Sequence, residues 1–276
     1  MKILIKKIFE NKLVLFGITI IIFLILLAFL SPVISPHDPY QQDLLVRLQG
    51  PSLNHLMGTD ELGRDVFSRM LMGIRVSLLI GILASFISIV IGTLVGLISG
   101  YAGKWWDTFF MRLVDVMLCF PTLFLILMIL AVFEKPSIYL IVGIIAFTAW
   151  AGLARMVRAE VLSVKEREYM LVAKGLGLSN ARILFIHLLP NVISPILVAA
   201  TLTVGSAILM ESGLSFLGLG VQPPDPSWGN ILTSGKDFIH SAWWLSLFPG
   251  LAILITVLGF NLLGEGLRDA LDPKHQ

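Results

Sequence analysis

Long uncharged runs alternate with short charged stretches along the chain. Six such runs cover residues 13–30, 76–103, 116–133, 136–154, 188–210 and 242–264. A helix needs about 20 apolar residues to cross the ~30 Å hydrocarbon core of a bilayer. The runs lack the strict alternation of barrel strands. The pattern therefore predicts an all-α membrane protein with six transmembrane helices.

The charged residues around the runs set the expected helix ends. We predict spans at about residues 13–34, 76–101, 115–133, 137–155, 190–212 and 243–265. The first run is longer than the apolar core of a signal peptide and no A-x-A site follows it, so we interpret it as a retained span. No repeat, low-complexity tract or Gly/Ser linker divides the chain. We therefore predict a single transmembrane domain over residues 1–276.

The composition is that of a membrane protein, and the distribution of basic residues indicates its orientation in the membrane. The chain of 276 residues is 57% hydrophobic and 14% charged, whereas a soluble domain carries roughly 25% charged residues. An even number of spans puts both termini on one side, and most of the 20 Lys and Arg residues fall on that side. Basic segments stay in the cytoplasm, so we predict cytoplasmic termini. The net charge of only +2 shows no footprint of nucleic-acid binding.

The predicted cytoplasmic loop, at about residues 156–189, contains the stretch EYMLVAKGLG. We predict a short helix there that ends at Gly175 and Gly177, since glycine accepts the left-handed conformation of a helix C-terminus. Ser179 can cap the following helix, and Pro190 stands where that helix is expected to meet the membrane. This helix–turn–helix loop, called the finger below, is either a connector along the membrane surface or a rigid helix that docks into a groove of a partner.

Two segments on the opposite side are further candidates. Residues 66–75 place their apolar side chains on one face, which predicts an amphipathic helix on the outer leaflet with Asp65 and Arg69 spaced for an ion pair. Asp60, Arg64 and Asp65 either contact a partner or belong to a capped, salt-bridged surface helix. The stripe Gly92, Gly96, Gly100 allows close helix packing, within the chain or with a second membrane subunit.

Glu211 follows the fifth apolar run directly. An ionisable group at membrane depth is a functional candidate, although Glu211 can also lie in the outer interface, bonded to neighbouring backbone. The proline-rich stretch GVQPPDPSWGN that follows contains Asp225 and Trp228. It forms either a lid or plug over a pathway or a tight return into the sixth span. Glu211, Asp225 and Trp228 are therefore the candidates for the outer loop and the pathway.

Several kinds of chemistry have no motif in the sequence. No GxxxxGK[ST] occurs, so the chain cannot bind ATP phosphates by that route, and HExxH, CxxC and GxSxG are also absent. No two histidines have the spacing of metal ligands, so we expect no metal site; the five are His37, His55, His187, His240 and His275.

The finger resembles the cytoplasmic loop of bacterial ABC importer permeases. That pattern reads Glu-Ala-Ala, three residues, Gly, nine residues, Ile-x-Leu-Pro, and the matching positions here are Ala173, Gly177, Leu189 and Pro190. The departures are Leu171 in the Glu position, Val172 for the first Ala and His187 for Ile, while Glu168 lies one turn upstream. In that family the loop docks on the ATP-hydrolysing subunit. The resemblance implies this role here for Glu168, Leu171, Val172, Ala173, Gly177, Leu178 and Pro190.

Residues 58–78, 211–232 and 248–273 resemble the C-type subunit of the peptide/nickel branch of these permeases. The resemblance covers essentially the whole chain and implies a type I ABC importer permease fold. It also implies a homologous permease partner, two ABC ATPases that bind ATP and Mg, an extracytoplasmic solute-binding protein, and a bacterial or archaeal cytoplasmic membrane. This chain would then bind no cofactor.

The resemblance leaves the solute open. Short peptides are the first expectation and nickel or a metal chelate is the alternative. Two other classes stay as hypotheses: an intramembrane enzyme, which would need a catalytic partner for Glu211, and a channel or carrier that works as a single chain.

Overall fold

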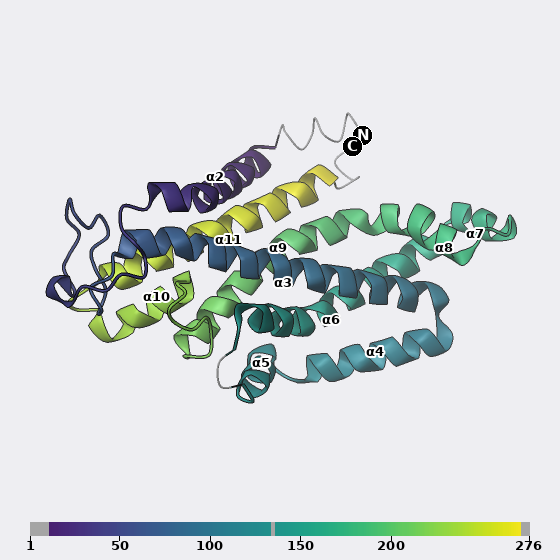
Figure 1. Cartoon of the computed structure of the whole chain (residues 1–276). Coiled ribbons are helices and arrows are strands. Elements are labelled where there is room, and N and C mark those ends of the chain that lie inside the picture. Colours follow the sequence, from purple (N-terminus) through teal and green to yellow (C-terminus); the bar gives the residue numbers. More distant parts are fainter. Residues whose placement is uncertain (1–10, 134–135, 272–276) are drawn as a thin grey trace.

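The computed structural model describes residues 11–133 and 136–271, and the expected cytoplasmic termini lie mostly outside these ranges. The long helices run in roughly one direction, with α3 along the middle of the bundle (Figure 1). Their order is α2 (Lys12–Ile34), η1 (Leu44–Val46), α3 (Val66–Ala102), α4 (Lys104–Cys119), α5 (Thr122–Leu130), α6 (Ile138–Lys165), α7 (Glu168–Gly175), α8 (Asn180–Arg182), η2 (Ile183–Leu188), α9 (Leu189–Phe216), α10 (Trp228–Gly235), η3 (Lys236–Phe238) and α11 (Trp244–Leu271). In the described ranges, β structure is limited to an isolated bridge between Thr59 and Asp65. The all-α prediction is confirmed.

Within the described residues, five helical stretches are long and apolar enough to cross a membrane: α2, α3, α6, Asn180–Phe216 and α11. The run predicted as a span at 115–133 is instead divided between α4 and α5, which meet at 84°. Phe120 has extended backbone because the ring of Pro121 disfavours a helical residue before it. The count of six spans holds when this bent pair is one crossing.

The helix α3 begins at Val66, well before the predicted start of its span at residue 76. Val66, Met70 and Ile74 are buried in one apolar cluster with side chains of α10 and α11. The prediction of an amphipathic helix on the outer leaflet is therefore wrong, because its apolar face packs inside the protein. The expected pairing of Asp65 with Arg69 is also wrong, since the Asp65 carboxylate caps α3 by accepting from the Ser68 N–H.

The glycine stripe of α3 lies against α6. A Cβ atom added at Gly96 would lie 2.6 Å from the Cβ of Val157, and one at Gly92 would lie 2.8 Å from the Trp150 carbonyl oxygen. Small residues let two helices approach closely. Of the two roles left open for the stripe, the structure shows packing within the chain.

The two ends of the bundle hold different elements. At one end lie α10 and the residues 35–65 that join α2 to α3, called the long connection below; at the other end lie α7 and α8 (Figure 1). The helix α3 reaches from one end to the other. Near its middle, the bundle exposes many large apolar side chains, as expected of a surface that faces lipid or another membrane subunit.

Candidate functional site

The short helix α7 is attached to the bundle through one face. Met170 is fully buried and Ala173 nearly so, and Met170 belongs to an apolar cluster that includes Val164 of α6 and Ile183 of η2. The opposite face is open: Leu171 and Val172 are 60% and 61% exposed. The result is a firmly attached helix with apolar side chains directed away from the protein. Glu168 is exposed in its first turn, where the helix dipole favours a negative charge.

The end of α7 is a tight turn centred on Gly177. Its φ angle of +72° lies in the left-handed region, and the N–H of Leu178 donates to the Ala173 carbonyl at 3.4 Å. This six-to-one hydrogen bond with glycine at C′ is the Schellman pattern. Ser179 then begins α8 by accepting from the Arg182 N–H at 3.4 Å. The turn therefore has a defined geometry.

The helix that follows the turn continues into the membrane span without a break. Residues 183–188 form a π-helical turn, in which the N–H of Leu189 donates to the carbonyl of Leu184. Pro190 is the second residue of α9 and follows this π-helical turn directly. The turn after α7 is thus joined to one helical stretch, Asn180–Phe216, that enters the bundle.

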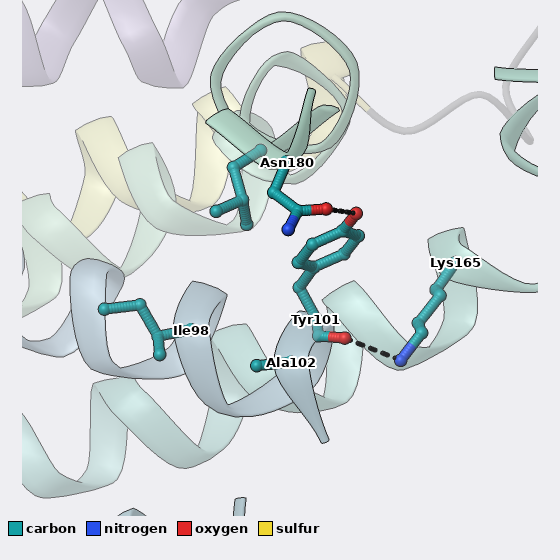
Figure 2. A pocket seen from close by; sticks show the side chains of 6 residues that line it. Ile98, Tyr101, Ala102, Lys165 and Asn180 are labelled. Atoms are coloured by element: carbon teal, nitrogen blue, oxygen red, sulfur yellow. Dashed lines mark hydrogen bonds between the residues drawn. The ribbon is translucent and has the colours of Figure 1, made fainter. Parts of the chain in front are cut away.

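A pocket of about 430 Å³ at this end lies between α3, α6 and α8. Figure 2 shows that Tyr101 of α3 donates its hydroxyl to the Asn180 side chain at 2.8 Å, while Lys165 donates to the Tyr101 carbonyl at 2.8 Å. Beside it, Arg158 of α6 forms a two-point ion pair with Asp107 of α4. Sequence reasoning did not single out these residues, since they meet only when four helices pack together.

The candidates Glu211 and Trp228 lie at the other end of the bundle, far from α7. Glu211 is fully buried, and its Oε1 accepts from the hydroxyls of Ser215, at 2.7 Å, and Ser227, at 2.8 Å. Its partners are thus side chains and not the neighbouring backbone, which was one of the two alternatives for Glu211. Ser227 caps α10. Trp228 is also fully buried, and its Nε1–H donates to the Met70 carbonyl, so both side chains fix α10 and its preceding loop to the bundle.

Asp225 links this loop to the long connection. The Tyr40 hydroxyl donates to its Oδ1 at 3.2 Å. Burial, and then the negative charge of Asp225, raise the pKa of Tyr40 above its ordinary value. The phenol therefore stays protonated at neutral pH and continues to donate.

The predicted outer segment forms a buried ionic network. Arg64 Nε lies 2.7 Å from Asp60 Oδ2, and Arg69 Nε lies 3.5 Å from the same oxygen. Asp60, Arg64 and Asp65 are each at most 5% exposed. Buried charges of this kind are held by pairing and hydrogen bonding. In this chain the three residues hold the long connection on the start of α3.

Comparisons with known proteins all match this chain to membrane subunits of transport systems. Residues 92–276 match a family described as binding-protein-dependent transport system inner membrane component, and residues 1–51 match the N-terminal TM domain of oligopeptide transport permease C. A dipeptide transport system permease protein of Alkalihalophilus pseudofirmus is 45% identical over 98% of this chain and 88% of its own length. A di/tripeptide permease protein of Pseudomonas aeruginosa is 42% identical over 96% and 89%, and an oligopeptide permease protein of Bacillus subtilis is 41% identical over 96% and 87%.

Proposed function

Because the chain belongs to the family of binding-protein-dependent transport system inner membrane components, we propose that it is one of two permeases of an ATP-driven peptide importer. It would line the pathway with a homologous permease in a bacterial or archaeal cytoplasmic membrane. Two ABC ATPases would bind ATP and Mg, and an extracytoplasmic protein would deliver the solute. The chain itself would hydrolyse nothing.

The exposed face of α7 carries this proposal. Leu171 and Val172 are 60% and 61% exposed on a helix whose other side is buried, and Leu176, directly after its last residue, is 74% exposed. Apolar side chains grouped on a protruding helix favour docking into a groove of a partner protein over contact with water. Leu171 stands where related loops have Glu, so apolar contact would replace a polar one at this position.

The attachments of α7 support a mechanical role. Met170 and Ala173 join it to the bundle, and the Tyr101–Asn180 hydrogen bond joins the next helix to α3. ATP binding would close the ATPase dimer and move α7 as a rigid body. The spans would then tilt so that the pathway faces the outside of the membrane. Such a shift requires that ATP-bound ATPases favour one conformation of the bundle over the other.

The solute class rests on the named relatives. Those described above carry the names of dipeptide, di/tripeptide and oligopeptide permeases, which favours short peptides over nickel for this chain. Selection among peptides would belong largely to the separate binding protein.

A pair of substitutions tests the docking role. We expect Leu171→Asp to abolish co-purification of the ATPases and peptide-stimulated ATP hydrolysis, because a carboxylate would enter an apolar groove. Leu53→Asp, at a side chain 97% exposed on the long connection, provides the matched control and should retain ATPase association. Substitutions at exposed sites usually change stability by at most about 0.5 kcal/mol, so both variants should fold. Normal ATPase association of Leu171→Asp would overturn the proposal, as would peptide uptake by the chain reconstituted alone.

A further inference from the structure

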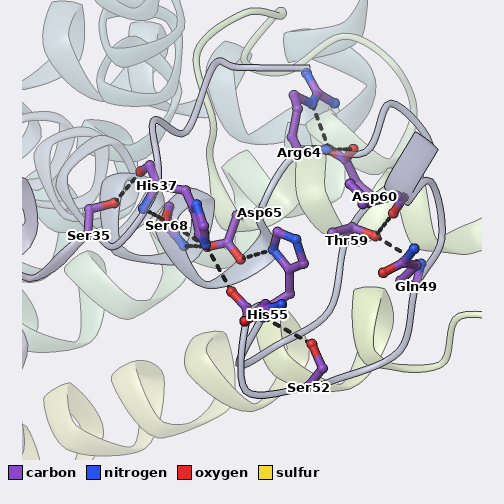
Figure 3. A network of polar contacts seen from close by, with 12 residues as sticks. Ser35, His37, Gln49, Ser52, His55, Thr59, Asp60, Arg64, Asp65 and Ser68 are labelled. Carbon is purple, nitrogen blue, oxygen red and sulfur yellow. Dashed lines mark hydrogen bonds and ion pairs between the residues drawn. The ribbon is translucent and has the colours of Figure 1, made fainter. Parts of the chain in front are cut away.

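The long connection brings together two histidines and one aspartate. His37, His55 and Asp65 each offer one ligand atom, and these three atoms lie within 4.8 Å of one another. His55 Nδ1 lies 2.9 Å from Asp65 Oδ1, and the rings of His37 and His55 have centroids 4.9 Å apart (Figure 3). A cavity of about 180 Å³ adjoins them and is also lined by Asp38 and Asp43. The negative charge around this cavity favours a cation.

Further hydrogen bonds orient two of the three side chains, those of His37 and Asp65. His37 Nε2 lies 2.9 Å from the Asn54 carbonyl oxygen, so a proton on Nε2 is donated there and Nδ1 keeps its lone pair. Asp65 Oδ2 accepts from the N–H and the hydroxyl of Ser68, which leaves Oδ1 for the cluster. Metal-binding imidazoles commonly donate their second N–H to a backbone carbonyl in this way. The cluster therefore has supporting contacts typical of a ligand set.

The donor atoms select a class of metal ion. Two imidazole nitrogens and one carboxylate oxygen suit Zn²⁺ and similar borderline transition metals, whereas Mg²⁺ and Ca²⁺ prefer oxygen alone. We propose that His37, His55 and Asp65 bind one divalent transition-metal ion of the Zn²⁺ class, with water or Asp38 as a fourth ligand. Metal–ligand bonds of about 2.0–2.1 Å at tetrahedral angles place ligand atoms about 3.3 Å apart. The His55 Nδ1 and Asp65 Oδ1 atoms, 2.9 Å apart, would separate by a few tenths of an ångström on binding, and the exposed His37 ring would move closer to them.

The position of the cluster defines what the ion would do. His37 follows closely after α2, His55 lies in the turn of the long connection, and Asp65 is the N-cap of α3. One ion would therefore join the end of one membrane helix to the start of another. It would act as a fixed crosslink of this end of the bundle, opposite the end that carries α7.

Zinc titration of the purified full-length chain tests the site. The protein, freed of its affinity tag and treated with a chelator, is titrated with ZnCl₂ and separately with MgCl₂ by calorimetry. We expect one Zn²⁺ per chain and no comparable Mg²⁺ binding. Loss of a supporting residue weakens metal binding about 10–100-fold, so loss of a ligand in His37→Ala or His55→Ala should weaken it by about 100-fold or more. His240→Ala, on a neighbouring connection and outside the cluster, should bind as the wild type does.

Two outcomes would overturn the proposal. One is a wild-type chain that takes up no Zn²⁺ at micromolar concentration. The other is unchanged Zn²⁺ affinity in the double variant of His37 and His55. If His55→Ala fails to fold, His37→Ala decides the question alone, because the His37 side chain is exposed and its removal leaves the helices intact.

Discussion

The turn after α7 allows a test in which the same chemical change has opposite effects at two neighbouring positions. Gly177 has a φ of +72°, and nothing lies within 4 Å of a Cβ built there. The cost of Gly177→Ala is therefore purely conformational, about 1–2 kcal/mol for an L-residue in the left-handed region. Gly175 also has open space around a Cβ, but it is the last residue of α7 and its φ is not positive. Gly175→Ala should stabilise α7 by up to about 1 kcal/mol.

Hydrogen exchange measures both effects directly. The N–H groups of Leu176 and Leu178 form the hydrogen bonds that close the turn, and they exchange when it opens. Gly177→Ala should raise their exchange rates about 5–30-fold, as expected from 1–2 kcal/mol, while Gly175→Ala should lower them by up to about fivefold. If α7 transmits force only when the turn is rigid, Gly177→Ala should also reduce peptide-stimulated ATP hydrolysis. Equal exchange in the two variants would refute the reasoning.

Three further predictions concern the bundle and the long connection. Gly96→Val should lower the free energy of unfolding by about 1–3 kcal/mol through overpacking against α6. The control Gly152→Ala, with nothing within 4 Å of an added Cβ, should not lower the melting temperature. Similar melting of both variants in detergent would contradict the close α3–α6 contact. Glu211→Ala should cost about 1–3 kcal/mol because two serine hydroxyls lose their acceptor, and Glu211→Gln, which keeps an acceptor, should recover part of the loss in thermal melts. The pKa of Tyr40 is raised, so the stabilising contribution of its phenol is present below the ordinary tyrosine pKa of about 10 and is lost as pH rises through the raised value. In an absorbance titration, Tyr40→Phe should remove a phenol that titrates late. An unchanged titration curve would argue against the bond to Asp225.

Local patterns were sufficient to predict most of the membrane helices and the short helix and turn of the finger, but not the bend between α4 and α5. The length of an uncharged, apolar run is enough to predict a span, because a helix must be about 20 residues long to cross the bilayer core. The helix at Glu168–Gly175 and the glycine turn after it depend on near neighbours in sequence, and the structure contains both. The docking role assigned to these residues stays a prediction.

Features that depend on distant contacts were not predictable in the same way. The face of residues 66–75 has the pattern of a surface helix, and only the packing of α10 and α11 shows that it is buried. Trp228 was a candidate for the pathway, yet it fills the space beside α3. His37 and His55 lack ligand spacing in sequence because the fold of the long connection, not helix periodicity, brings them together.

The unbroken length of α3 has a geometric consequence for how a transporter of this kind could move. Its 37 residues, at 1.5 Å each, make a rod of ~55 Å. With one tip held by the ionic network at Asp60 and the other by Tyr101, a pivot of only ~5° about the first tip would swing the second by ~5 Å, about one turn of helix. A rotation of a few degrees about the Asp60 end is thus enough to shift the Tyr101 end of α3, at the same end of the bundle as α7, by about one helical turn.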